Sequence, residues 1–223
     1  MPTQILTAQQ PRLTKAQIDA WRAVPAAVAA DQLGGRGHVD PAIRPIRPLG
    51  LEGKLIGNAV TAWCEPADYG PAHHAIAVAE PGDVLVIACN GRSDAAVIGE
   101  LLSTAARLKG IAGAIVDGCV RDVATIAQWP DFHLFTRWIT PRGPSSMERG
   151  IVDGPVVFGG VTVHPRDLVI GDDDGLVIVP NGLVESKLKP CLDRVHAEIG
   201  WEKQLASGQT TLEVFNVPKS LRV

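Results

Sequence analysis

The stretch from residue 99 to residue 122 constrains the fold more than any other part of this sequence. Residues 99–102 (Gly-Glu-Leu-Leu) open an Ala-rich segment of helical composition, and Lys-Gly at 109–110 ends it. An apolar run at 111–116 follows, and residues 117–122 read Asp-Gly-Cys-Val-Arg-Asp. The pattern predicts a helix, a tight glycine turn, a buried strand and a polar loop at the carboxyl end of that strand.

The polar residues of this unit suggest chemistry. Ligands of open α/β sheets collect at the carboxyl ends of strands, and helix N-termini attract anions. An arginine such as Arg121 beside free amides suits a small carboxylate or phosphate. A neighbouring carboxylate such as Asp122 suits a divalent cation or a proton. From spacing alone, an ordinary surface ion pair and an Asp-Gly turn explain the same residues, so both interpretations stay open.

Composition and charge exclude several classes of protein. The formal net charge of −3 disfavours non-specific nucleic-acid binding. No apolar run reaches the length of a membrane span, and the N-terminus does not resemble a signal peptide. The four cysteines are widely separated, with no Cys-x-x-Cys pair. We therefore expect a cytoplasmic protein with buried free thiols and no membrane partner.

The first half of the chain predicts helices and a parallel β-α-β unit. Thr14 and Gln17 form a capping box for a helix that carries Ile18, Trp21 and Val24, and a second helix is expected at 26–33. A strand is expected at 56–63, a helix at 72–79 and a buried strand at 84–89. That last strand and the 99–122 unit together suggest a β-α-β crossover.

The second half predicts antiparallel hairpins and one long helix. After a short helix ending near residue 128, a strand is expected at 132–139. Gly159-Gly160 and the turn at 171–175 each separate two short apolar runs, which is typical of hairpins. Residues 183–206 are predicted to form a single helix in spite of Pro190 and Gly200. Four segments are predicted to be irregular: residues 1–12, 34–50, 141–154 and the extended tail 207–223.

These elements favour a mixed α/β (α+β) layered domain rather than a regular doubly wound sheet. We expect one domain over residues 1–223, with its core at about 25–206.

Other candidate sites are weaker. His73 and His74 point about 100° apart on a helix, and Asp172–Asp174 lack the spacing of a calcium loop. Gly91 and Arg92 follow a buried strand and are candidates to line the same sheet edge as Arg121.

The motif at 99–122 resembles the RraA-like superfamily, which includes the class II pyruvate aldolases acting on 4-hydroxy-4-methyl-2-oxoglutarate and 4-carboxy-4-hydroxy-2-oxoadipate. The signature is an acid, here Glu100, followed after twenty residues by Arg121-Asp122. Further matching pieces are the Pro-Gly-Asp-Val-Leu-Val segment at 81–86, the hairpin at 158–163 and the Asp-Gly-Leu-Val-Ile-Val-Pro segment at 174–180. The resemblance covers roughly residues 25–215, nearly the whole chain.

The resemblance implies a role for each residue of the motif. Asp122 would ligate Mg²⁺ or Mn²⁺ directly, and Glu100 would hold a water molecule bound to that cation. Arg121 would bind the 2-keto acid and stabilise the developing enolate. Gly99 opens the helix start, where the amides of Leu101 and Leu102 would take the pyruvyl carboxylate.

The resemblance also implies the assembly. The family fold is a layered β/β/α swivelling-type domain, here with N-terminal helices and a long C-terminal helix, that forms homotrimers, often paired into hexamers, with sites between subunits. A glutamate from the C-terminal helix of an adjacent subunit would reach into the site, and Glu198 matches it best, with Glu202 as the alternative. Two positions depart from the aldolase pattern: Glu100 stands where Asp is common, and Thr125 stands where some members carry an acid.

The implied activity is cleavage of a 4-hydroxy-2-oxo di- or tricarboxylic acid to pyruvate and a second keto acid. Loss of CO₂ from oxaloacetate gives the same pyruvate enolate, so oxaloacetate decarboxylase activity is expected with it. Two alternatives stay open. One is a regulator of the same superfamily that binds and inhibits ribonuclease E without catalysis. The other is an inert trimeric relative whose motif only ties a strand to a helix.

Overall fold

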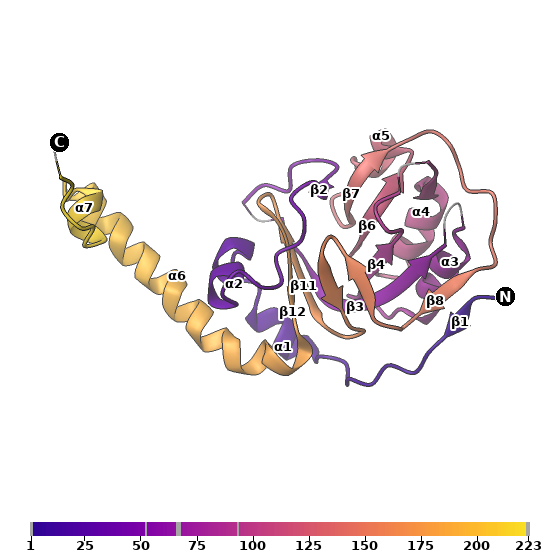
Figure 1. Cartoon of the computed structure of the whole chain (residues 1–223), viewed down its shortest axis with the longest axis horizontal. Helices are drawn as coiled ribbons and strands as arrows, with labels where there is room; N and C mark the ends of the chain where they lie inside the picture. Colours follow the sequence, from indigo (N-terminus) through magenta and orange to yellow (C-terminus); the bar gives the residue numbers. More distant parts are fainter. Residues whose placement is uncertain (1, 52, 66–67, 93, 222–223) are drawn as a thin grey trace.

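The framework of the molecule is a mixed β-sheet. Helices from the middle of the chain cover one face and a β-hairpin packs on the other, while the helices near the two ends of the chain lie to the opposite side (Figure 1). The computed structural model describes residues 2–51, 53–65, 68–92 and 94–221. The strands are β1 (Gln4–Ile5), β2 (Arg44–Pro45), β3 (Leu55–Cys64), β4 (Val84–Ala88), β5 (Ala96–Ile98), β6 (Gly113–Val120), β7 (His133–Ile139), β8 (Gly150–Val152), β9 (Val156–Phe158), β10 (Val161–Val163), β11 (Leu168–Asp172) and β12 (Gly175–Val179). The helices are α1 (Lys15–Ala20), α2 (Ala26–Gln32), α3 (Gly70–Val78), α4 (Glu100–Leu108), α5 (Val123–Ile126), the 3-10 helix η1 (Asn181–Leu183), α6 (Val184–Ala206) and α7 (Thr211–Val214).

The centre of the sheet is parallel, and antiparallel strands flank it on both sides. The strand order is β1-β8-β3-β4-β6-β7-β2. Strands β3, β4, β6 and β7 run parallel, whereas β8 and β11 pair antiparallel with β3, and β2 pairs antiparallel with β7. Every residue of β4 and β6 is buried, as expected for parallel strands covered on both faces. The predicted crossover from β4 through α4 to β6 is confirmed.

The two faces of the sheet carry different layers. Along β4, Leu85 and Ile87 belong to a core shared with α3, α4 and α5. Val84 and Val86 point to the other face, into a core shared with Phe158 of the β9–β10 hairpin. Successive residues alternate between the two cores because strand side chains alternate with a period of two. The layered arrangement predicted for this chain is therefore confirmed.

A third core holds the helices at the two ends of the chain. Trp21 is 1% exposed and donates from Nε1 to the carbonyl oxygen of Val184 at 3.1 Å, which ties the turn after α1 to the start of α6. The predicted long C-terminal helix is confirmed as α6, with Pro190 inside it. In Figure 1, α6 runs away from the body on the side opposite α3, α4 and α5. None of the described helices is both long enough and apolar enough for a membrane crossing.

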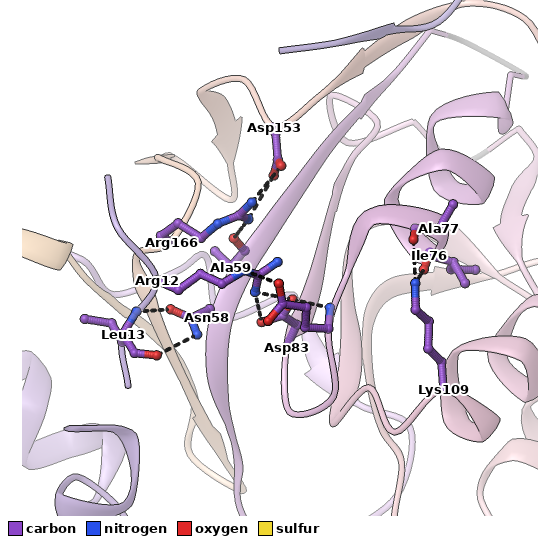
Figure 2. A network of polar contacts seen from close by, with 11 residues as sticks. Arg12, Leu13, Asn58, Ala59, Ile76, Ala77, Asp83, Lys109, Asp153 and Arg166 are labelled. Carbon is purple, nitrogen blue, oxygen red and sulfur yellow. Dashed lines mark hydrogen bonds and ion pairs between the residues drawn. The ribbon is translucent and has the colours of Figure 1, made fainter. Parts of the chain in front are cut away.

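Polar contacts fasten the N-terminal segment across the sheet (Figure 2). The side-chain amide of Asn58 accepts from Leu13 N at 2.9 Å and donates to Leu13 O at 3.3 Å. Next to it, Nη1 of Arg12 lies 2.6 Å from each carboxylate oxygen of Asp83. Burial raises the pKa of Asp83, against the opposing effect of the Glu80 N–H and of Arg12. The first residues of the chain are thus anchored to β3 and to the turn before β4.

Several predicted boundaries were wrong. The loop expected at 117–122 is mostly strand, because β6 continues to Val120. Asp117 stays buried there since Arg137 Nε lies 2.6 Å from Oδ1 and Gly159 N donates to Oδ2 at 2.9 Å. The irregular segments contain the short strands β1, β2 and β8, and the extended tail contains α7, which a Thr210–Glu213 capping box begins. The first helix ends at Ala20, short of Trp21 and Val24.

The four cysteines are buried and free, as predicted. Cys64 is the last residue of β3 and Cys89 is the first residue after β4. The two cysteines are neighbours because Trp63 and Ala88, the residues before them, are paired in the parallel β3–β4 ladder. A hydrogen bond with Cys64 and burial both raise the pKa of the Cys89 thiol well above its usual range. The thiol of Cys89 is therefore a packing group rather than a nucleophile.

Candidate functional site

Arg121 and Asp122 stand at the carboxyl end of β6, where the chain turns into α5. The backbone N–H of Arg121 donates to Ile98 O at 3.1 Å, which continues the pairing with β5. Asp122 then adopts a left-handed conformation, with φ 59° and ψ 30°, and becomes the N-terminal cap residue of α5. This turn brings Arg121 Nε within 3.6 Å of Asp122 Oδ2, and each side chain is 42% exposed. A non-glycine residue in this region is uncommon and marks a position held by its surroundings.

The start of α4 faces the same two side chains. The backbone N–H of Glu100 donates to Asp122 Oδ2 at 3.0 Å, so Asp122 caps α4 from across the sheet edge. The next two amides, of Leu101 and Leu102, have no hydrogen-bond acceptor among the described residues. They are the unsatisfied N–H groups that every helix start presents. The predicted meeting of a helix start with Arg121 and Asp122 is therefore observed.

Gly99 makes this approach sterically feasible. A Cβ atom at Gly99 would lie 2.5 Å from Asp122 Oδ2 and 2.8 Å from Arg121 Cγ. Both distances are shorter than real Cβ contacts, so any side chain at 99 would push the two functional groups away. Gly99 itself has extended backbone angles, so its role is to leave space rather than to bend the chain.

A hollow of about 310 Å³ opens at this point. Its lining residues are Arg121, Asp122, Ile139, Thr140 and Pro141. The volume is at the small end of ligand sites, which suits a small organic acid rather than a nucleotide. The loop that closes it after β7 is fixed by two backbone hydrogen bonds, Thr140 N to Val120 O at 3.1 Å and Ala96 N to Arg142 O at 2.8 Å.

Arg92 lies at the same edge of the sheet, but its charge is already paired. It follows β4, which runs parallel to β6. Its guanidinium lies 3.2 Å from Asp94 Oδ1, and this hydrogen bond lowers the pKa of Asp94. Arg92 does not belong to the lining of the hollow. The expectation that Gly91 and Arg92 line the pocket is therefore not supported by the contacts of Arg92.

Glu198 is not among the residues that line the hollow beside Arg121. It sits on α6, where its Oε1 accepts from Arg194 Nε at 2.8 Å. The guanidinium of Arg194 in turn covers the ring of Trp201, 4.6 Å from its centroid. Because α6 leaves the body on the side away from α4, neither Glu198 nor Glu202 joins the hollow of its own chain (Figure 1). Their expected place in a neighbouring subunit's site remains a prediction.

The donor set at the hollow fits a hard divalent cation that keeps most of its water. Asp122 offers a partly exposed carboxylate. Glu100, which is also exposed, is the first residue of the helix that Asp122 caps. Within the ranges that the structure describes, no three His, Cys, Asp or Glu side chains gather as a ready-made metal cage. Mg²⁺ is commonly held by one or two carboxylates plus water and substrate oxygens, which is the arrangement these residues allow.

The other acidic and histidine candidates have structural partners. Asp172 accepts from Ala26 N at 2.8 Å, and Asp173 accepts from Leu49 N and Gly50 N at 2.7 and 2.9 Å. The hairpin-turn interpretation of this acidic run is confirmed. His73 lies on α3 with its ring 4.8 Å from that of Tyr69, and burial lowers its pKa.

Two residues near the site were missed in the sequence. Arg137 joins Asp117 and Asp40, at 2.6 and 2.7 Å, and so ties β6 and β7 together. Burial alone would lower the pKa of Arg137, but the bonds to the two carboxylates raise it. The second missed residue is Gly143, which lies against the guanidinium of Arg121. A distant glycine in a Gly/Pro-rich loop gives no signal in a single sequence.

Comparisons with known proteins identify the family of this chain. A family model described as RraA-like, Aldolase/RraA, matches residues 16–178. A protein of Halalkalibacterium halodurans named "Putative 4-hydroxy-4-methyl-2-oxoglutarate aldolase" is 31% identical over 180 residues, which cover 79% of this chain and 84% of that protein. Another of that name, from Ectopseudomonas mendocina, is 33% identical over 129 residues, covering 57% of this chain and 77% of the relative.

Solved structures give the same result. An uncharacterized protein from Pseudomonas syringae pv. tomato superposes with a TM-score of 0.79 at 25% identity, covering 92% of this chain and 99% of the other. The structure of "the RNA-processing inhibitor RraA from Thermus thermophilis" superposes with a TM-score of 0.62 at 25% identity, covering 70% and 92% of the two chains. The chain therefore belongs to the RraA-like, Aldolase/RraA family.

Proposed function

We propose that this protein is a divalent-metal-dependent lyase that cleaves a 4-hydroxy-2-oxo di- or tricarboxylic acid to pyruvate and a second keto acid. Decarboxylation of oxaloacetate would accompany this activity. The observation that carries the proposal is a small hollow lined by Arg121 and Asp122, in which Asp122 also accepts a hydrogen bond from the Glu100 N–H at the start of α4. The aldolase names of relatives at 31 and 33% identity support the same reaction class.

The substrate's pyruvyl end would bind through its carboxylate. The amides of Leu101 and Leu102 present two donors and the positive end of the α4 dipole. Arg121 adds a planar cation whose N–H groups match carboxylate and enolate oxygens. Its position beside these amides allows charge on the keto oxygen to be stabilised as the C3–C4 bond breaks.

The cation would be held by Asp122 directly, while Glu100 would hold water around it. A divalent cation at this point supplies electrostatic stabilisation of the negative charge that develops on the keto oxygen. The residues present fit such an ion because Asp122 lines the hollow, Glu100 begins the helix whose first N–H bonds Asp122, and neither carboxylate is buried. An Asp122→Asn protein should bind Mn²⁺ at least about tenfold more weakly by titration calorimetry.

Bond cleavage would begin at the C4 hydroxyl. A water molecule held by Glu100 would accept the hydroxyl proton as it gives one of its own protons to the Glu100 carboxylate, and the electrons of the C3–C4 bond would move into the pyruvyl carbonyl to form the enolate. The C4 fragment leaves as the second keto acid, and C3 of the enolate takes a proton to give pyruvate. With oxaloacetate, the same bond breaks and CO₂ leaves instead.

Release of pyruvate tests the proposal. The protein would be offered oxaloacetate and 4-hydroxy-4-methyl-2-oxoglutarate with Mg²⁺, then with EDTA, and pyruvate would be measured through lactate dehydrogenase. We expect metal-dependent release that Arg121→Ala reduces at least about a hundredfold. Arg107→Ala is the matched control, because Arg107 lies in the last turn of α4 and pairs with Asp131. Full activity of Arg121→Ala would refute the mechanism.

The regulator interpretation keeps one specific observation in its favour. The similar protein from Thermus is an RNA-processing inhibitor by name. Ribonuclease E would therefore be offered to the wild-type protein and to Arg121→Ala. Binding and inhibition by both proteins, with no pyruvate released by the wild type, would replace the lyase proposal by the regulator.

A further inference from the structure

The guanidinium of Arg121 rests against a residue that has no side chain. A Cβ atom at Gly143 would lie 2.6 Å from Arg121 Nη1 and 3.6 Å from Cζ. Apart from the residues next to Gly143 in the chain, these two atoms are the only neighbours within 4 Å of that position among the described residues. Gly143 does not adopt the left-handed backbone region that favours glycine. Its missing side chain therefore matters for Arg121 and for little else.

A second glycine borders the same side chain nearer its base. A Cβ atom at Gly99 would lie 2.8 Å from Cγ and 3.1 Å from Nε of Arg121. Arg121 thus passes close to Gly99 along its aliphatic part and reaches Gly143 with its charged end. Near Gly143, backbone hydrogen bonds of Thr140 and Arg142 fasten the loop to β6 and β5. The two walls are rigid backbone rather than mobile side chains.

We propose that Gly143 is a positioning residue that sets the direction of the Arg121 guanidinium. It touches no substrate in this proposal. By lacking a Cβ, it lets the guanidinium lie where Nε faces Asp122 Oδ2 at 3.6 Å and the outer N–H groups face the hollow's loop. The inference rests on the proposed function for its catalytic consequence, but not for its geometry.

The structure gives the size of the expected displacement. Ordinary van der Waals contacts of a Cβ begin at 3.4 Å, so in Gly143→Ala the Nη1 atom must retreat from 2.6 Å by about 0.8 Å. The end of an arginine side chain can make this movement without disturbing the backbone. A misplacement of this size costs roughly tenfold to a hundredfold in kcat/KM when the group contacts the reacting atoms.

A double-mutant cycle separates this role from a structural one. Pyruvate release from oxaloacetate would be compared for the wild type, Gly143→Ala, Arg121→Lys and the double variant. We expect Gly143→Ala to lose roughly tenfold to a hundredfold in kcat/KM with Arg121 present, and less than about twofold with lysine at 121. Gly182→Ala is the matched control, because nothing lies within 4 Å of its Cβ position, and it should behave as the wild type.

A readout that needs no turnover keeps this test distinct from that of the proposed function. The side-chain Nε–Hε resonance of Arg121, identified by its absence in Arg121→Lys, would be followed by ¹⁵N NMR spectroscopy. We expect Gly143→Ala to move this resonance while the melting temperature stays within about 2 °C of the wild type. An unmoved resonance would overturn the proposal even in an active enzyme, as would equal losses of activity in both backgrounds. If the protein releases no pyruvate, a shifted resonance would still support the positioning role.

Discussion

Replacing Arg166 by methionine should destabilise the protein by about 3 to 5 kcal/mol, because it leaves the buried carboxylate of Asp153 without its partner. Arg166 and Asp153 are only 10 and 7% exposed at their side chains, and they form two hydrogen bonds of 3.0 and 2.8 Å (Figure 2). The backbone N–H of Arg166 also bonds Ala59 O, and that of Asp153 bonds Thr61 O. The ion pair therefore joins the turn between β8 and β9 to the turn between β10 and β11, and both turns are bonded to β3.

Backbone strain at positions 153 and 166 should be nearly the same in the wild type and in the variants. Arg166 and Asp153 both have positive φ, 73° and 54°. Methionine keeps the Cβ of arginine, and asparagine tolerates the left-handed region as aspartate does, so the strain at each position is nearly unchanged. The differences between variants then report the ion pair itself.

Urea denaturation, followed by the fluorescence of the five tryptophans, would give the free energies of unfolding. In Arg166→Met/Asp153→Asn the unpaired group is an amide rather than a carboxylate, so the double variant should be more stable than Arg166→Met alone by about 1 to 2 kcal/mol. If the two substitutions destabilise additively, the interaction between these side chains is not what stabilises the folded state.

Two further predictions address the hollow and the loop that closes it. Gly99→Ala should reduce oxaloacetate decarboxylation roughly a hundredfold, because its Cβ would displace both Asp122 and Arg121; wild-type rates in the coupled assay would contradict this. Burial raises the pKa of Asp68, but hydrogen bonds from Ser146, Gly70, Glu148 and Arg149 outweigh burial and bring it below its usual value. The contribution of the Asp68 carboxylate to stability should be complete above about pH 4 and be lost as the pH falls through the lowered pKa. In acid denaturation below about pH 4, Asp68→Asn should therefore lose less stability than the wild type.

The elements that sequence predicted best are those with local signals. The apolar runs of β4 and β6 and the glycine before α4 were sufficient to place the β-α-β unit and the helix start at Glu100. The meeting of that helix start with Arg121 and Asp122 followed from the parallel register of neighbouring strands. The chemical roles of these residues remain predictions.

The elements that were missed depend on distant partners. Asp117 signals a turn in isolation, yet it lies inside β6 because Arg137 and Gly159 satisfy its carboxylate. Strands β1 and β8 are two and three residues long and gain their backbone partners from each other and from β3. Gly143 could not be linked to Arg121 before the loop after β7 was seen to fold back over β6. Each of these errors arises from contacts across more than fifteen residues.

Hydrogen exchange along the long helix α6 should report whether another protein surface covers it in solution. Only its first half packs on the body, through Val184, Cys191 and partly buried Leu188, Leu192 and Val195. Its 23 residues span about 34 Å, so the second half extends well beyond that support. Amide hydrogens of a single isolated molecule should exchange slowly up to about Val195 and progressively faster towards Ala206. Among the residues that the structure describes, the outer turns are covered only locally, where Phe215 after α7 packs edge-on against Trp201 with ring centroids 5.3 Å apart. Slow exchange that continues to Ala206, and that persists in Phe215→Ala, would mean that another protein surface shields the outer turns.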